Sequence, residues 1–348
     1  MTDLLCGHRQ GFGAMGLTAF YGAACSNAHG VAVMTSAHAA GCRLFDTAQI
    51  YQQFTPEIPA ETCRYNEELV GRFLRTLSKN QRDDIIVATK FYPRRERFRA
   101  GAFVYSFELL LKETDASLAR LGVDCIDLYY LHRMYPEDVV DMETLAKDMA
   151  KLQALGKIRG YGLSEASAEQ IRRAHAAFPM SAVQQEWSLF ARDLEEEVVP
   201  TCQELGIAIV AYSPIARGML GGALTSPPRD WRSTIPYLTE ANIEANRRLV
   251  QQAENIAANK GISVAQLCLA WVIAKGGIPI PGTTKVERAA SNHTGATGVV
   301  LKDQEMAALE AATAGVQGLR GDESYMAKTF HRGVFKDSEG AAAKGAEK

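Results

Sequence analysis

Residues 41–51, GCRLFDTAQIY, contain the pattern that decides the fold, a short apolar strand that ends on a charged side chain. Leu44 and Phe45 indicate a buried strand, Asp46 ends it, and Tyr51 follows five residues later. A carboxylate at the end of an apolar strand costs free energy unless another group pairs with it. The partner of Asp46 must therefore come from elsewhere in the sequence.

Short apolar runs of the same kind alternate with amphipathic stretches almost to the end of the chain. Strict alternation of strands and helices is typical of a parallel sheet. About eight such units in 348 residues favour a closed (β/α)8 TIM barrel over an open doubly wound sheet. After a first strand near QGFGAM, the expected strands are RLFD, DIIVATK, CIDLYYLH, IRGYGLS, SAVQQEW, IAIVAYS and GGIPIPG, and the expected helices are 26–40, 64–78, 103–121, 142–155, 167–177, 194–205 and 284–294.

A single barrel domain accounts for residues 1–334 in this interpretation. Residues 335–348 are small and polar, which predicts a disordered tail. The stretch 216–241 is rich in Gly, Pro and Ser and does not fit the alternation. We expect it to form a long functional loop over the top of the barrel.

The composition excludes several classes of protein. A formal net charge of −2 gives no attraction to nucleic acid or to an anionic membrane, and no apolar run approaches the roughly 18 residues that span a bilayer. The seven cysteines are scattered without a C-x-x-C spacing, which argues against structural zinc and disulfides and for a reducing compartment. With no signal-peptide pattern in MTDLLCGHRQ, these features predict a cytoplasmic protein without a metal site.

Residues 11–16, GFGAMG, match the G-x-G-x-x-G pattern of dinucleotide-binding βαβ units. The strand before Gly11 is short and polar, and about ten residues separate Gly16 from the next helix. Asp46 lies 30 residues beyond Gly16, where an acid about 20 residues on is expected. A helix N-terminus so distant could not hold a pyrophosphate. We therefore interpret this stretch as a glycine-rich turn after the first strand.

Polar side chains end the second, third and fourth strands, at Asp46, Lys90 and His132. Each alone has an ordinary explanation, as a helix cap, a solvated lysine or a core histidine. Strand ends in a barrel point to one face, so these three side chains should converge near Tyr51. An ammonium paired with Asp46 would lower the pKa of the Tyr51 phenol, and a neutral imidazole could orient a substrate oxygen. This set predicts a general acid for a carbonyl oxygen, with hydride from a bound cofactor.

An ordered set of motifs, covering residues 11–318, resembles the aldo-keto reductases. The motifs are GCRLFDTAQIY, VATKF, IDLYYLHR, IRGYGLSEAS, AVQQEWSLF, AYSPIARGML and IPIPGTTKVERAASN. HRMYP, GLSEAS and EWSLFARDLEEEVVPTCQELGI are most similar to the branch that includes perakine reductase and pyridoxal reductase. The resemblance implies a catalytic tetrad of Asp46, Tyr51, Lys90 and His132, and an extended NADP(H) bound without a Rossmann unit.

The same resemblance implies a cofactor site. Tyr212 would stack on the nicotinamide, as a flat aromatic ring can. Lys285 and Arg288 would contact a 2′-phosphate, which favours NADP(H) over NAD(H) because Arg and Lys are common phosphate partners. Ser164, Glu165 and Gln184 would lie at the carboxamide, Ser213, Ile215, Arg217 and Gly218 at the pyrophosphate, and Asn292 at the adenosine; Gly13, Ala14, Met15, Gly282, Thr283 and Thr284 complete the set.

The sequence also departs from the pattern of the family. Glu165 stands where many members have Asn, Gln52 follows the tyrosine where Gly is usual, and Ala216 could restrict the pyrophosphate loop. Residues 52–65 are longer than the usual turn and contain two prolines, so we expect a semi-rigid flap that sets substrate choice. The N-terminal region is short, so the hairpin that usually plugs the barrel bottom is expected to be missing or rebuilt.

The leading interpretation is an NADPH-dependent reductase whose partner is a small-molecule carbonyl substrate, acting as a monomer or weak homo-oligomer. An alternative is a cofactor-binding redox-sensing auxiliary subunit, similar to the potassium-channel β-subunits. A third is a Schiff-base aldolase acting through Lys90, although Asp46 and a phenol beside that lysine suit an ion pair better than a neutral amine. A short-chain dehydrogenase is disfavoured, because none of the twelve tyrosines has a lysine four residues later.

Overall fold

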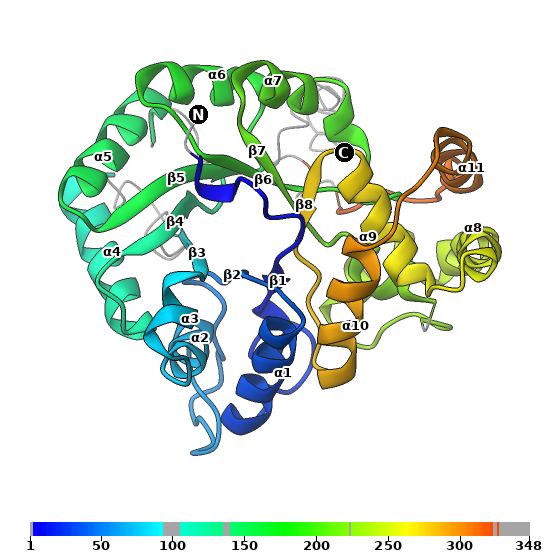
Figure 1. Ribbon diagram of the computed structural model, residues 1–348, viewed down its shortest axis with the longest axis horizontal. Coiled ribbons are helices and arrows are strands. Elements are labelled where there is room, and N and C mark those ends of the chain that lie inside the picture. Colours follow the sequence, from blue (N-terminus) through cyan, green and yellow to red (C-terminus); the bar gives the residue numbers. More distant parts are fainter. Residues whose placement is uncertain (1–2, 93–104, 135–139, 223, 323–325, 327–348) are drawn as a thin grey trace, which may run out of the picture.

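The computed structural model describes residues 3–92, 105–134, 140–222, 224–322 and 326, and eight parallel strands form its centre (Figure 1). The strands pair in the order of the sequence, from β1 to β8. This topology confirms the predicted (β/α)8 barrel. The strands are β1 (Phe12–Gly13), β2 (Leu44–Asp46), β3 (Ile86–Phe91), β4 (Ile126–Leu131), β5 (Ile158–Ser164), β6 (Ala182–Glu186), β7 (Ala208–Tyr212) and β8 (Gly277–Pro279).

The barrel closes where the first strand meets the last. The backbone N–H of Gly11 donates to the Pro279 carbonyl at 3.0 Å, and that of Gly13 donates to the Pro281 carbonyl at 3.2 Å. A Cβ at Gly282 would lie 2.7 Å from the carbonyl oxygen of Gly13, so only glycine permits this approach. The turn predicted after the first strand corresponds to the 3-10 turn η2 (Met15–Leu17), which contains Gly16, whereas Gly13 lies in β1 and Gly11 lies at its seam with β8.

In the described part of the chain, eight helices surround the barrel, and two further helices, α8 and α11, pack against each other at one side of it (Figure 1). The surrounding helices are α1 (Asn27–Ala39), α2 (Asn66–Leu74), α4 (Phe107–Leu121), α5 (Met142–Ala154), α6 (Ala168–Ala177), α7 (Val198–Leu205), α9 (Val264–Ala274) and α10 (Val286–Thr297); the others are α3 (Lys79–Asp83), α8 (Glu240–Asn259) and α11 (Asp303–Thr313).

All seven expected helices are present, whereas α3, α8, α9 and α11 were not predicted. The sequence of α9, VAQLCLAWVIA, is apolar at nearly every position, so it lacks the contrast between faces that identifies a surface helix. The residues expected to begin and end helices do so in the structure. Ser167 caps α6 by accepting from the backbone N–H of Gln170, and Gly206 ends α7 with a φ of +65°.

The inside of the barrel is filled by a small apolar cluster that the N-terminus completes. Residues Asp3–Leu5 form a short 3-10 helix, η1, from which Leu4 and Leu5 pack against the interior side chains. These side chains come from alternate strand positions and are Leu44, Ile86, Ala88, Leu128, Tyr130, Ala182, Val210, Ile278 and Ile280. The plug expected at the barrel bottom is therefore rebuilt as a single 3-10 turn.

The stretch 216–241 is a loop of consecutive 3-10 turns, as its composition indicated. The turns are η5 (Ala216–Gly221), η6 (Trp231–Thr234) and η7 (Pro236–Leu238), after which α8 begins. Among the described residues no single helix is long and apolar enough to cross a bilayer; α8 and α9 reach the criteria only as a pair bent by 87°. The expected tail, 335–348, lies outside the described residues.

Truncating Leu5 tests whether η1 is a structural plug. Leu5 is 6% exposed, so Leu5→Ala should lower the free energy of unfolding by about 2–5 kcal/mol through lost apolar contact and a residual cavity. Leu319→Ala is the control, because Leu319 is 53% exposed. Urea denaturation measures both, and equal effects of the two substitutions would contradict the role of the plug.

Candidate active site

The four side chains expected to converge do so at the carboxyl ends of β2, β3 and β4. The Nζ of Lys90 lies 2.5 Å from Oδ1 of Asp46 and 5.1 Å from the centre of the Tyr51 ring. The rings of Tyr51 and His132 meet edge to face, with centroids 5.6 Å apart. Asp46, Lys90 and His132 are all buried, while Tyr51 is partly exposed. Tyr51 is therefore the most exposed member of the set, although Asp46 also lines the groove described below.

The ion pair is held by groups that satisfy its remaining hydrogen-bonding capacity. Lys90 also donates to the Thr47 carbonyl at 2.7 Å, and the Gln184 amide donates to Oδ2 of Asp46 at 2.7 Å. Burial lowers the pKa of Lys90, and the contact with Asp46 opposes that shift. The pairing answers the question raised by the sequence, because the carboxylate that ends β2 is compensated by the ammonium on β3.

His132 is neutral at physiological pH. Burial holds the pKa of His132 well below its usual range, and the charges of Arg133 and Lys90 lower it further. Its Nδ1 is buried and has no hydrogen-bond partner among the described residues. Tyr92 packs edge to face on the same ring, with centroids 5.4 Å apart. The imidazole is thus fixed between two aromatic rings in the state that can share a hydrogen bond with a substrate oxygen.

A groove of about 570 Å³ leads from Asp46 and Tyr51 across the barrel top to α10. Of the residues predicted for a cofactor, its lining includes Gly13, Met15, Gln184, Tyr212, Ser213, Ile215, Arg217, Gly218, Gly282, Thr283, Thr284, Lys285, Arg288 and Asn292. The other three predicted residues, Ala14, Ser164 and Glu165, do not line the groove. The N–H of Ala14 donates to the Asp46 carbonyl at 2.8 Å, and Ser164 accepts from Arg133 at 3.3 Å. Glu165 is fully buried.

The groove suits an extended dinucleotide. Its inner end presents the ring of Tyr212 beside the tetrad, and its outer end presents the two cations Lys285 and Arg288. A flat aromatic ring can stack on a nicotinamide, and cations at the other end can hold a phosphate. The groove therefore combines an aromatic side chain, Tyr212, in the same lining as Tyr51 with two cations at the start of α10.

Two buried carboxylates, Glu165 and Glu186, support this wall from behind. The hydroxyl of Tyr212 donates to Glu165 at 2.8 Å, and the guanidinium of Arg217 pairs with Glu186 at 2.6 Å. Arg320, which follows α11, contacts both carboxylates. Sequence reasoning assigned no role to Glu186 or Arg320, since no local spacing connects positions that lie 134 residues apart.

Aromatic side chains from two loops meet over the groove. The ring of Trp231 lies 6.2 Å from that of Phe20 and 6.0 Å from that of Tyr21, and the Arg217 guanidinium lies 4.9 Å from the Trp231 ring. Phe20 also meets the Tyr51 ring edge to face at 6.1 Å. Sequence reasoning missed this cluster, although a tryptophan within a loop rich in Gly, Pro and Ser was a usable signal.

Backbone strain is concentrated around the groove. In the described part of the chain, the non-glycine residues with positive φ are Phe20, Glu165, Ser213, Ala216 and Arg217. All of them line the groove or contact a residue that does. Left-handed conformations cost free energy in residues with a Cβ and cluster at functional sites. Ala216 adopts a φ of +45°, so the loop that was expected to contact the pyrophosphate has a left-handed residue at the position where the sequence departs from the family pattern.

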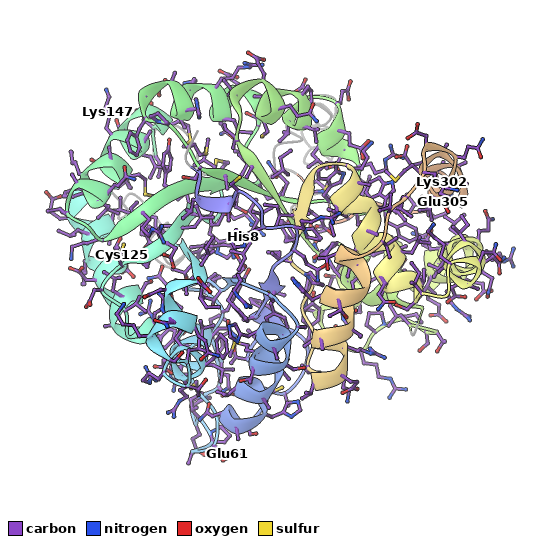
Figure 2. The ribbon with its side chains drawn as sticks, viewed as in Figure 1. His8, Glu61, Cys125, Lys147, Lys302 and Glu305 are labelled. Atoms are coloured by element: carbon purple, nitrogen blue, oxygen red, sulfur yellow. The ribbon has the colours of Figure 1, made fainter. Side chains whose placement is uncertain are left out.

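The segment 52–65 projects away from the barrel, and Figure 2 marks Glu61 near its outer tip. It is joined at its base by a bridge between Gln52 and Tyr65, and Arg64 donates to the carbonyls of Gln53, Thr55 and Pro56. Phe54 is 69% exposed, and no residue of 53–62 lines the groove. Its influence on substrate choice stays a prediction.

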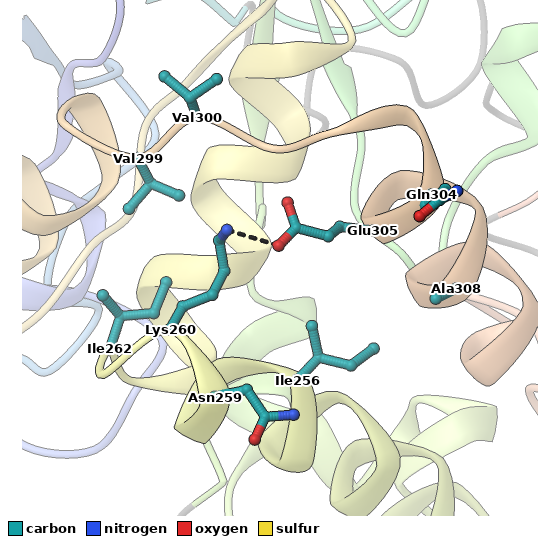
Figure 3. Close-up of a pocket in the computed structure, with 9 residues that line it drawn as sticks. All are labelled: Ile256, Asn259, Lys260, Ile262, Val299, Val300, Gln304, Glu305 and Ala308. Atoms are coloured by element: carbon teal, nitrogen blue, oxygen red, sulfur yellow. Dashed lines mark hydrogen bonds and ion pairs between the residues drawn. The ribbon is translucent and has the colours of Figure 1, made fainter.

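A second hollow lies between the end of α8 and the start of α11 (Figure 3). Its volume is about 600 Å³, and the ion pair of Lys260 and Glu305, 2.6 Å apart, crosses it. This hollow is formed by the outer helices rather than by strand ends. Within the described residues, no three His, Cys, Asp or Glu side chains lie close enough together to hold a metal ion.

Comparison with known proteins identifies the family. The family model described as "Aldo/keto reductase family" matches residues 10–314. A curated relative, "Probable aldo-keto reductase 1" from Glycine max, is 39% identical over 303 residues, which cover 86% of this chain and 83% of the relative. The chain therefore belongs to the aldo/keto reductase family.

Solved structures show the same architecture. A glycerol dehydrogenase from Gluconobacter oxydans is 27% identical with a TM-score of 0.74, over 88% of this chain and 92% of that one. An aldo-keto reductase from Klebsiella pneumoniae, solved in complex with NADPH, is 26% identical with a TM-score of 0.64, over 90% and 94% of the two chains. The (β/α)8 barrel is thus a fold shared with these proteins.

The low pKa of His132 predicts a pH dependence of stability. The unfolded chain takes up a proton on this histidine below its ordinary pKa of about 6.5, whereas the folded chain does not. The free energy of unfolding should therefore fall as the pH drops below about 6.5, by up to about 1.4 kcal/mol per pH unit from this residue. His132→Gln should reduce the slope of the unfolding free energy against pH by that amount. Urea denaturation between pH 7.5 and 5 measures this slope.

His175→Gln is the matched control, because His175 is only partly buried and the pKa of His175 is lowered less strongly. Parallel curves for the wild type and His132→Gln would show that the buried imidazole is not the group responsible.

Proposed function

We propose that this protein reduces an aldehyde or ketone to an alcohol with NADPH, and that Tyr51 is the general acid. The observation that carries this proposal is the buried Lys90–Asp46 pair, whose ammonium lies 5.1 Å from the ring of Tyr51 and beside neutral His132. A phenol near neutrality is a weak proton donor, and a fixed cation next to it favours the phenolate that remains after donation.

Each of the four side chains has its own role in the proposed reaction. The hydroxyl of Tyr51 donates its proton to the carbonyl oxygen as that oxygen gains charge. Lys90 stabilises the phenolate left behind, and Asp46 keeps Lys90 in place. The neutral imidazole of His132 donates a hydrogen bond that orients the carbonyl next to the phenol. Bound NADPH supplies the hydride, and the phenolate regains its proton from solvent.

Binding of NADPH is assigned to the groove. Tyr212 would face the nicotinamide, Arg217 the pyrophosphate, and Lys285 with Arg288 the 2′-phosphate; all four residues line the groove. The family and the NADPH complex of the Klebsiella pneumoniae relative support the choice of cofactor. We also propose, from the motifs HRMYP and GLSEAS, that the chain belongs near the perakine reductase and pyridoxal reductase branch.

A panel of aldehydes and ketones with NADPH and NADH, followed by absorbance, tests the proposal directly. Steady turnover with fast release of the oxidised cofactor is expected. Tight retention of the cofactor with negligible turnover would instead indicate a redox-sensing auxiliary subunit. Reduction of a trapped imine by borohydride would indicate a Schiff-base enzyme, against which the complete burial of Lys90 argues.

Removing the phenolic hydroxyl tests the general acid. Tyr51→Phe should reduce kcat by roughly two to four orders of magnitude, the usual contribution of a positioned acid, while the Kd of NADPH changes little. Tyr65→Phe is the control, because Tyr65 lies at the base of the segment 52–65 and away from the groove. A Tyr51→Phe enzyme that keeps more than half of the wild-type kcat would overturn the assignment.

Removing one cation at the outer end tests the 2′-phosphate site. Arg288→Ala should weaken NADPH roughly ten- to a hundredfold, because a charge-assisted hydrogen bond contributes about 1.5–3 kcal/mol. NADH lacks the phosphate and should lose little affinity. Arg248→Ala, on the exposed face of α8, controls for net charge. Fluorescence titration with both nucleotides gives the result, and an equal loss for NADPH and NADH would contradict the phosphate contact.

A further inference from the structure

We propose that Arg320 is a positioning residue that holds both ends of the nicotinamide half of the groove through two buried carboxylates. This inference rests on the proposed function, since it takes the groove as the NADPH site. Arg320 lies in the segment after α11 and is 3% exposed. It does not line the groove, so it acts on a bound nucleotide only through other side chains.

Arg320 bridges three acidic side chains from different parts of the chain. Its Nη2 lies 2.8 Å from Oε2 of Glu165, its Nη1 lies 3.4 Å from Oε2 of Glu186, and its Nε lies 3.1 Å from Oδ2 of Asp193. Arg320 and Glu165 are 155 residues apart in the sequence. Its planar guanidinium can serve three acceptors at once, which a lysine ammonium on a flexible stem does less well.

Each of the two buried carboxylates holds a residue of the groove wall. Glu165 accepts from the Tyr212 hydroxyl at 2.8 Å and from the backbone N–H of Glu186 at 3.1 Å. Glu186 binds Arg217 through both oxygens, at 2.6 and 3.3 Å. Tyr212, proposed for the nicotinamide, and Arg217, proposed for the pyrophosphate, are therefore held by the same network of charges. Arg320 contacts both carboxylates of this network.

The charges make this anchoring depend on Arg320. Glu165 and Glu186 are fully buried, and Arg217 and Arg320 are nearly so. Without Arg320, Arg217 alone would compensate Glu186, and Glu165 would keep only its hydrogen bonds and the more distant charge of Arg133. A buried carboxylate that loses its partner must protonate or move. The charged carboxylate would move and release the Tyr212 hydroxyl, whereas the protonated group could stay in place and still accept from that hydroxyl through its carbonyl oxygen.

Protonation gives the proposal a pH signature. Burial raises the pKa of Glu165, but the charges of Arg320 and Arg133 and the hydrogen bonds from Arg320 and Tyr212 outweigh it and hold the pKa below its usual value. The charged or titratable groups facing Glu165 are Arg320, Arg133, Tyr212 and Glu186. Loss of Arg320 should raise the pKa of Glu165, so the defect should ease as the pH falls.

The first test compares Arg320→Met with Arg192→Met by fluorescence titration with NADPH. Arg192 also ties the region after β6 to α11, through Glu195 and Glu310, but it does not line the groove or contact Tyr212 or Arg217. Both substitutions should lower stability. Only Arg320→Met should raise the Kd of NADPH, by about ten- to a hundredfold, by analogy with the effect of removing the hydrogen-bond partners of metal-binding side chains.

A double substitution separates the charge effect from simple loss of structure. Glu165→Gln keeps an acceptor for Tyr212 and removes the negative charge. In the Arg320→Met background it should restore at least half of the lost binding free energy, and it should abolish the improvement at low pH that Arg320→Met alone shows between pH 8 and 6. Arg320→Lys, which keeps the charge, should show an intermediate Kd and provides a folded variant if Arg320→Met does not fold.

The outcomes are distinguishable. An unchanged Kd in both Arg320→Met and Arg320→Lys, with tight binding of NADPH by the wild type, would overturn the role of Arg320 and leave the proposed function intact. Equal losses in Arg320→Met and Arg192→Met, or no recovery in the double variant, would also overturn it. Failure of the wild type to bind NADPH would instead contradict the proposed function.

Discussion

The ion pair of Asp46 and Lys90 is the interaction on which the active site depends. Two charges removed from water cost several kcal/mol each unless geometry and hydrogen bonds compensate them. Here the compensation comes from the Thr47 carbonyl and the Gln184 amide, so β2, β3 and β6 must all be in register for the pair to be stable. The same constraint fixes a cation near the Tyr51 ring, and the charge of that cation adds to burial and to Arg133 in lowering the pKa of His132. This one ion pair therefore compensates two buried charges and also supplies the cation that is proposed to act on Tyr51.

The sequence was most informative where function is carried by strand ends, and least where it is carried by pairs of distant residues. Asp46, Lys90 and His132 could be predicted to converge because alternation placed them at the ends of adjacent strands, and the barrel geometry follows from that order. Glu165 was expected at the carboxamide, but the structure turns its carboxylate toward Arg320 and away from the groove. No periodicity encodes such a contact. The helix α9 was missed for a different reason, since burial on all sides removes its amphipathic pattern.

The groove differs from the rest of the barrel in how it is stabilised. The barrel interior and the helix interfaces are apolar and regular. The groove wall is built from left-handed loop residues, buried carboxylates and guanidinium groups, each unfavourable alone. These elements persist because they compensate one another, which is the usual condition of a preorganised site. Substitutions there should affect ligand binding before they affect folding, whereas changes in η1 or the helix interfaces should do the reverse.

The seam between β1 and β8 has a consequence for the order of assembly during synthesis. Gly11 and Gly13 emerge early from the ribosome, but their partners at Pro279 and Pro281 follow almost the whole barrel later. The four tetrad residues lie in or shortly after β2, β3 and β4, and Gln184 on β6 completes their hydrogen bonds, whereas the groove also needs both edges of the seam and the segment beyond α11. Contacts this distant in sequence form late and slowly. The residues proposed for proton donation are therefore synthesised well before the segment after α11 that completes the wall of the groove.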